Sequence, residues 1–142
     1  MAALTSGRAT PEWKPNTVLR SYPQGNNAQI WEGGIVVLNT AGYAVAGYSG
    51  TIATGSYLPV VGCAQMSQLS PTGTDGQVNI DVHIGTFKFA ADVAFTAANV
   101  GSTCYIVNDQ TVSITVTTKS PAGIVQAFDG SGNPWVTLGL YG

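Results

Sequence analysis

Charged side chains are scarce in this sequence. Only 8% of its 142 residues are Asp, Glu, Lys or Arg, whereas a typical soluble domain has about 25%. Five basic against seven acidic residues leave a formal net charge of −2 at pH 7. Because nucleic-acid binding depends on clustered Lys and Arg that neutralise phosphates, the composition argues against a nucleic-acid-binding protein.

Histidine and cysteine are almost missing as well. One histidine and two cysteines provide little for a metal site or a disulfide scaffold, so we expect no metal and no other cofactor. Cys63 and Cys104 lie in apolar segments, where thiols behave as small hydrophobic groups. We expect both to be reduced and buried, although the sequence leaves a disulfide open because it does not report their separation.

Long apolar runs are also lacking. No stretch approaches the roughly 18 consecutive apolar residues of a membrane span. The first eight residues do not have the basic-then-apolar order of a signal peptide. We therefore expect a protein that is made in the cytoplasm and has no membrane partner.

The residues that are abundant favour β-structure. Eighteen glycines and seven prolines exclude a helical bundle, and 44% hydrophobic residues supply a core. Strict alternation over 78–84 places Val78, Ile80, Val82 and Ile84 on one face of a strand. Hairpins are expected at 104–116 and 124–140, and one helical turn at 96–101. We predict an all-β fold, a small antiparallel barrel or sandwich of about eight short strands with an extended N-terminal arm.

The arm is predicted to span residues 1–27 and the β-domain residues 28–142. Pro11, Pro15 and Pro23 favour extended backbone in the arm, and clear strand punctuation begins only at Ala28. A frayed terminus would have no reason to carry so many apolar residues. We expect the arm to dock on a partner surface, and the β-domain to fold without it. The predicted docking residues are Arg8, Trp13, Lys14, Val18, Leu19, Arg20 and Tyr22.

A second feature points to association between subunits. The interval from Gly33 to Thr74 contains no charged residue. The cores of protein interfaces are depleted in Lys, Glu and Asp, whereas monomers use charge to stay soluble. Hydroxyl and amide groups alone could also solubilise such a surface. The interface interpretation is favoured slightly, and it predicts a homo-oligomer.

Catalytic signatures are lacking. The only histidine, His83, lies on the polar face of the alternating strand with Asp81, and no serine motif accompanies the pair. The acidic residues at Asp75, Asp109 and Asp129 are typical of turns rather than of a catalytic pair or a calcium loop. We predict that the protein is not an enzyme and has no catalytic or metal-binding residues.

The second half of the chain resembles a known family. The stretch from Asp75 to Phe89 is similar to the "DG-x-V-x-V-x-V-x-x-G-x-F-x-F" stretch of small capsid decoration (cement) proteins of tailed phages. Residues 96–112 resemble the next block of that family, and residues 120–136 resemble its closing "AG-x-V … W-V" hairpin. The likeness covers residues 58–138 in the same order, but the family's basic residues are replaced at Asn79, Asp81 and His83.

The resemblance implies a virion protein on the outer surface of a bacteriophage capsid. Such a viral structural protein bridges and stabilises major capsid protein subunits, commonly as a homotrimer. The alternative is a small β carbohydrate-binding or adhesin-type module that uses tyrosines and tryptophans, and a small hydrolase domain ranks below it.

Overall fold

The fold is built almost entirely from strands. The computed structural model describes residues 2–48, 51–52, 56–115 and 120–138, and for residues 12–17, 51–52 and 56–57 only the backbone. The strands are β1 Glu12–Pro23, β2 Gln29–Ile30, β3 Ile35–Leu38, β4 Ala44–Ala46, β5 Thr51–Ile52, β6 Ser56–Tyr57, β7 Val60–Ala64, β8 Gln68–Leu69, β9 Asn79–Lys88, β10 Ala90–Ala91, β11 Thr103–Ile106, β12 Thr111–Ser113, β13 Pro121–Phe128 and β14 Pro134–Leu138. No helix in these ranges is long and apolar enough to cross a membrane.

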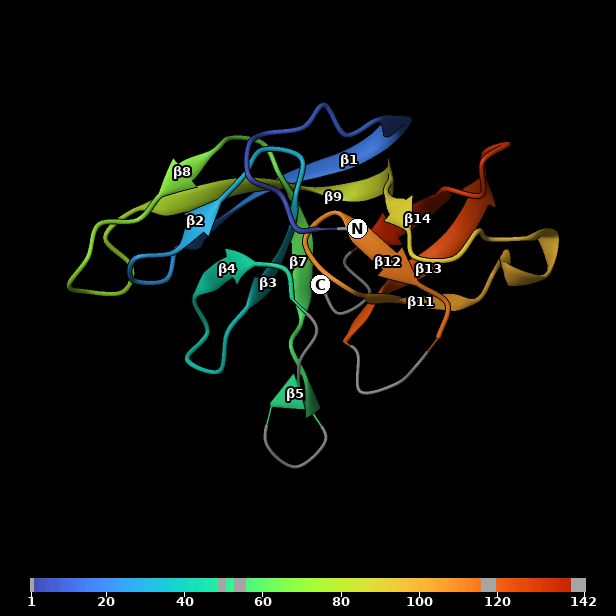
Figure 1. The fold of residues 1–142 in the computed structure, drawn as a ribbon. Helices are drawn as coiled ribbons and strands as arrows, with labels where there is room; N and C mark the ends of the chain where they lie inside the picture. Colours follow the sequence, from blue (N-terminus) through green and yellow to red (C-terminus); the bar gives the residue numbers. More distant parts are fainter. Residues whose placement is uncertain (1, 49–50, 53–55, 116–119, 139–142) are drawn as a thin grey trace.

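Ten strands form one strongly curved sheet (Figure 1). Its order is β10-β12-β11-β13-β14-β9-β7-β3-β4, with β1 added along β9, and every pair is antiparallel except β10 with β12. Over the described ranges the two ends of this sheet are not hydrogen-bonded to each other as a strand pair. The all-β prediction is therefore confirmed, with more strands than expected and as a sandwich-like sheet instead of a closed barrel.

Strand β9 separates two hydrophobic cores. Ile80 and Val82 point into a smaller core, whereas Phe87 and Phe89 point into a larger one. Side chains alternate between faces along a strand, so these even and odd positions lie on opposite faces of the sheet. Strand β3 has the same arrangement, since Val36 joins the smaller core while Ile35 and Val37 join the larger one. The alternation predicted for 78–84 is present from Asn79 to His83, whereas Val78 precedes β9 and Ile84 is half-buried and belongs to neither core.

The predicted local elements in the second half are also present. Strands β11 and β12 pair as a hairpin, as do β13 and β14. The helical turn is a 3-10 turn over Ala97–Asn99 with Thr96 as its N-cap, and Gly101 follows with φ +86°. Cys63 and Cys104 are buried reduced thiols in the larger core, as predicted.

The N-terminal residues lie on the rest of the chain. Strand β1 is extended, as an arm would be, and it pairs with β9 at eight register positions from Glu12↔Phe87 to Pro23↔Asn79. Figure 1 shows β1 running beside β9 across the top of the molecule. Tyr22 packs against the smaller core. The boundary at residue 27 and the independence of the β-domain stay predictions, because a strand can pair within its own chain and still be dispensable.

Candidate functional site

The predicted docking residues occupy two separate places. Arg8 precedes β1 and lies in a pocket beside the end of β9. The backbones of Trp13 and Lys14 are in β1, opposite the same end of β9, and their side chains are outside the described ones. The other four residues are further along β1, at Val18, Leu19, Arg20 and Tyr22.

Three of these residues form an exposed surface that we call the edge patch: Val18, Leu19 and Arg20. Val18 is 50% exposed and Leu19 is 60% exposed, although consecutive side chains of a strand point to opposite faces. In the described part of the chain β1 has no strand partner besides β9, so its outer edge is unpaired. The edge patch therefore offers both backbone groups and apolar side chains to a partner.

Residues 2–11, the N-terminal segment, are anchored by hydrogen bonds. The Leu4 backbone N–H donates to the Asp109 carboxylate at 2.8 Å, and the Arg8 N–H donates to the Glu32 carbonyl at 2.7 Å. The Thr10 hydroxyl donates to the Gly33 carbonyl. Gly33 has φ +83°, and a Cβ atom there would lie 2.2 Å from the Arg8 carbonyl oxygen. Only glycine lets the two backbones approach this closely.

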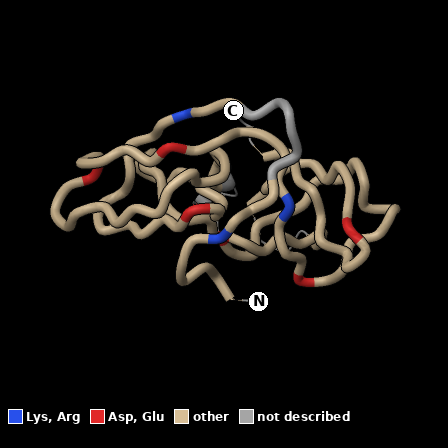
Figure 2. Tube along the Cα trace, turned by 90° about the horizontal axis from the view of Figure 1, so that it is seen from above, with Lys and Arg blue, Asp and Glu red and all other residues tan. Residues whose placement is uncertain are grey.

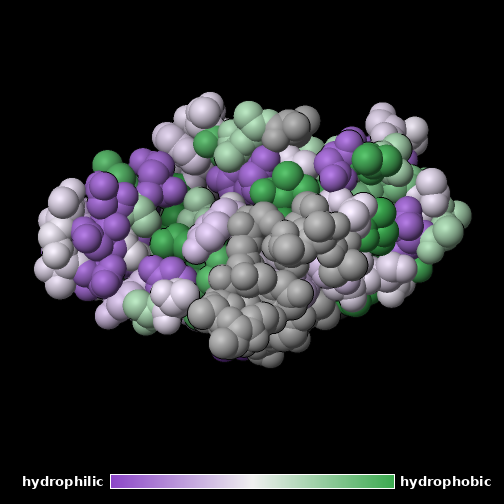
Figure 3. Space-filling view, turned by 60° about the horizontal axis from the view of Figure 1, so that its bottom comes forward, coloured by the Kyte–Doolittle hydropathy of each residue, from purple (hydrophilic) through white to green (hydrophobic). Residues whose placement is uncertain are grey.

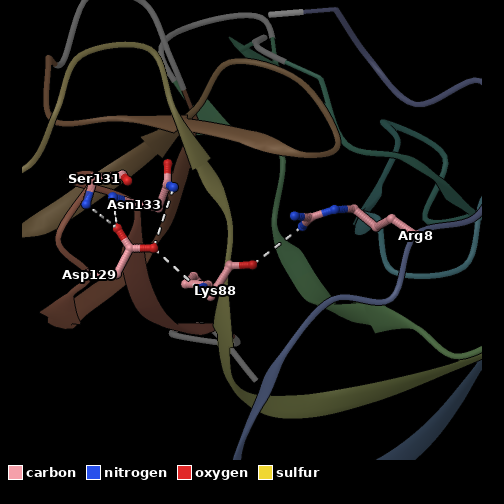
Figure 4. A network of polar contacts seen from close by, with 5 residues as sticks. All are labelled: Arg8, Lys88, Asp129, Ser131 and Asn133. Carbon is pink, nitrogen blue, oxygen red and sulfur yellow. Dashed lines mark hydrogen bonds and ion pairs between the residues drawn. The ribbon is translucent and has the colours of Figure 1, made fainter.

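The Arg8 pocket has a volume of about 240 Å³ and is lined by Arg8, Lys88, Phe89, Ala90, Gln110 and Asn133. The guanidinium of Arg8 lies 5.9 Å from the centre of the Phe89 ring and donates to the Thr10 hydroxyl and the Lys88 carbonyl. Figure 4 shows that the Lys88 carbonyl faces Arg8, whereas its ammonium group faces Asp129. The charged groups of Arg8 and Lys88 thus lie on opposite sides of the Lys88 backbone.

The positive charge of Lys88 is already balanced by a neighbouring carboxylate. Its ammonium group lies 3.2 Å from the Asp129 carboxylate and 5.7 Å from the centre of the Trp135 ring. The Asp129 carboxylate also accepts the backbone N–H groups of Asn133 and Ser131, which closes the β13–β14 turn. These bonds, led by the one from Asn133, lower the pKa of Asp129 to about 2. The turn role predicted for Asp129 is confirmed.

The surroundings of Arg8 and Asp109 stabilise their charged forms less well than water does. Burial lowers the pKa of Arg8 from its ordinary value, and electrostatic interactions with Cys63 and Asp109 oppose this shift. Burial also raises the pKa of Asp109, against the hydrogen bond from Leu4 and the charge of Arg8. Both groups therefore lose hydration on folding without full compensation.

The two aspartates predict opposite effects of pH on stability. Ionisation of Asp109 destabilises the fold, so its contribution is full below an unfolded pKa of about 3.9 and is lost as the pH rises through the raised folded value. The contribution of Asp129 is full above about 3.9 and is lost as the pH falls through about 2. Relative to the wild type, Asp109→Asn should gain stability from acidic to neutral pH, and Asp129→Asn should lose it. Urea unfolding of both variants across this range measures the two slopes, and parallel slopes would contradict the assignment.

The remaining candidates for chemistry lie elsewhere. His83 is half-buried in β9, in register with Leu19 of β1 and Cys63 of β7. Burial raises the pKa of the Cys104 thiol to about 12, so this cysteine stays protonated and unreactive at neutral pH. Within the described ranges no group of three or more His, Cys, Asp and Glu residues is arranged to hold a metal ion.

Sequence reasoning found Arg8 but missed its surroundings. Lys88 and Asn133 are 80 and 125 positions away, and no local pattern links them to Arg8. The one available signal was the scarcity of charge, because two of only five basic residues line this pocket. Figure 2 shows how widely the other charged residues are spaced along the trace.

Comparisons with protein-family models, with curated proteins and with solved structures found no match to this chain.

Proposed function

We propose that this protein is a structural component of a virion that decorates the outer surface of a phage capsid. It binds major capsid protein subunits, bridges them and thereby stabilises the shell. A ligand that binds only the intact shell shifts the equilibrium toward that shell by mass action. The resemblance of residues 58–138 to decoration proteins motivates the proposal.

The observation that carries the proposal is the exposed edge of β1. Natural β-proteins protect long edge strands by covering them or by placing charges and prolines on them. In β1 most of these residues lie in its first part, over 12–15, and only Arg20 adjoins Val18 and Leu19. β1 is twelve residues long, its outer edge is unpaired in the described structure, and its two large exposed apolar side chains, Val18 and Leu19, lie next to each other. Such an edge suits strand addition, in which backbone hydrogen bonds give affinity and alternate side chains give specificity.

The charge-free interval gives partial support to a homotrimer. Part of this interval lacks charge simply because it forms the hydrophobic cores of a single chain: Ile35–Val37 and Val60–Ala64 are buried there. What remains for an interface are exposed residues such as Tyr48 and Leu69, which are 46% and 59% exposed. Figure 3 shows hydrophobic side chains at the surface between hydrophilic ones on one face of the molecule. Association through such a surface would remove apolar area from water.

Co-sedimentation with capsids tests the proposed function. The probe is purified tailed-phage heads that lack a decoration protein, and binding is measured over a range of protein concentrations. Saturable binding with a fixed copy number and a raised melting temperature of the capsid is the expected result. Retention on a polysaccharide resin without binding to capsids would favour the carbohydrate-binding alternative and contradict decoration.

A charge introduced into the edge patch should weaken capsid binding. We expect Leu19→Lys to reduce affinity about tenfold, or about 1.4 kcal/mol, because a charged side chain would have to be buried against the partner. Since Leu19 is exposed in the free chain, unfolding should change by no more than about 0.5 kcal/mol.

Val93→Lys is the matched control. Val93 is 67% exposed and lies outside β1, so the substitution adds the same charge to another part of the surface. Its capsid affinity should equal that of the wild type. Equal losses in both variants would show a general charge effect, and no loss in Leu19→Lys would remove the edge patch from the docking surface.

A further inference from the structure

We propose that the Arg8 pocket binds a carboxylate, the acidic side chain of a partner protein, through the guanidinium of Arg8. This binding site goes beyond the proposed function and does not depend on it, because the pocket is present in the isolated chain. Four observations carry the proposal: the fixed position of Arg8, its incomplete compensation, the compensation of Lys88 and the size of the pocket.

The guanidinium of Arg8 is held in place before any ligand arrives. Its Nη1 donates to the Thr10 hydroxyl at 3.2 Å and to the Lys88 carbonyl at 3.3 Å, and its Cζ lies 5.9 Å from the centre of the Phe89 ring. The backbone of Arg8 is fixed by the bond to Glu32 and by the close approach of Gly33. A preorganised fork of donors loses little side-chain entropy on binding an anion.

The charge of Arg8 is not neutralised by contact. Across the described residues no carboxylate lies within 4.0 Å of its guanidinium, and Asp109, which attracts it at longer range, is occupied by the Leu4 N–H. Both hydrogen bonds of the guanidinium use Nη1 and end on uncharged oxygens. A guanidinium has five N–H donors, so donors remain for a bidentate pair with a carboxylate.

Lys88 does not compete for the same ligand. Its ammonium group is paired with Asp129, whose two oxygens also accept hydrogen bonds from Ser131 and Asn133. Figure 4 shows this group directed away from Arg8. An incoming anion therefore meets one uncompensated cation, Arg8, next to the amide side chains of Gln110 and Asn133 that also line the pocket.

The size and charge of the pocket select the class of ligand. A volume of about 240 Å³ lies below the roughly 300–1,000 Å³ of sites for whole small molecules. It suits one side chain and part of its backbone. A nucleic-acid strand would need several uncompensated cations, and the pocket has one.

Titration followed by heteronuclear NMR tests the assignment. The probe is N-acetylaspartate methylamide, and its uncharged analogue, N-acetylasparagine methylamide, is the matched control ligand. We expect saturable shifts of the Arg8 guanidinium and of the Gln110 and Asn133 side-chain amides, with a dissociation constant on the order of millimolar. Equal shifts with the asparagine analogue would overturn the proposal, as would shifts confined to β1.

Variants locate the site. Arg8→Gln should weaken binding of the aspartate probe at least about tenfold, whereas Arg20→Gln, which removes a charge from the exposed surface of β1, should leave it unchanged. If Arg8→Gln does not fold, Arg8→Lys keeps the charge and removes the fork, and we expect intermediate affinity. Full affinity in either Arg8 variant would contradict the proposal. A parallel titration with inorganic phosphate tests whether the pocket prefers another anion. Binding of phosphate without binding of the aspartate probe would also overturn the proposal.

Discussion

Replacing Gln24 by methionine should lower the free energy of unfolding by about 3 kcal/mol. Gln24 is fully buried directly after β1, and its side-chain amide donates to the carbonyls of Ala28 and Gln68 at 2.8 and 2.9 Å. Its Oε1 accepts a hydrogen bond from the Gln68 side chain at 2.7 Å. Methionine fills a similar volume but removes all three hydrogen bonds, each worth about 1 kcal/mol. The Ala28 carbonyl keeps the Ser70 N–H and the Gln68 side chain keeps the Asn79 carbonyl, so the loss is that of the three bonds.

Gln126→Met is the control for this substitution. Gln126 is an exposed residue of β13, so the same change of side chain should alter stability by no more than about 0.5 kcal/mol. Chemical denaturation of both variants, followed by tryptophan fluorescence, measures the difference. A loss below about 1 kcal/mol in Gln24→Met would mean that the amide network does not hold the joint between β1 and the rest of the sheet.

Gly33→Ala should displace the N-terminal segment and destabilise the fold by about 3 kcal/mol. The substitution adds strain of about 1–2 kcal/mol at a positive φ, and its Cβ collides with the Arg8 carbonyl and the Thr10 hydroxyl. Moving the segment away breaks the Arg8–Glu32 and Thr10–Gly33 hydrogen bonds, at about 1 kcal/mol each. Hydrogen exchange at Leu4 and Arg8 should increase in this variant.

Gly42→Ala separates backbone strain from displacement. Gly42 has φ +90°, close to the value at Gly33, but no atom lies within 4 Å of an added Cβ. This control should therefore cost only the strain, about 1–2 kcal/mol. Equal losses in the two variants would mean that residues 2–11 contribute little to stability, which is the behaviour expected of a separable arm. The comparison thus tests the boundary predicted at residue 27.

The sequence by itself determined the fold class and the local elements. Alternation over 78–84, the turn residues around Asp129 and the Thr96-to-Gly101 pattern act over a few residues, and the structure contains the strand, the hairpin and the 3-10 turn that they predict. Scarcity of histidine and cysteine likewise limited the chemistry without any knowledge of the fold. Such signals are legible because hydrogen bonds and side-chain periodicity within one element depend on near neighbours in the chain.

Only the tertiary structure decided how β9 is used. Its alternation predicts one apolar and one polar face. In the structure, Phe87 and Phe89 are buried in a second core, on the side of the sheet opposite to Ile80 and Val82. The pairing of β1 with β9 and the convergence of Arg8 with Lys88 join residues far apart in sequence. Which distant segments meet depends on the packing of the whole chain, because burial of apolar area is non-directional and does not specify a partner locally. The Arg8 pocket exists for this reason: the glycine at 33 admits the N-terminal segment, and the curvature of the sheet brings the end of β9 to it.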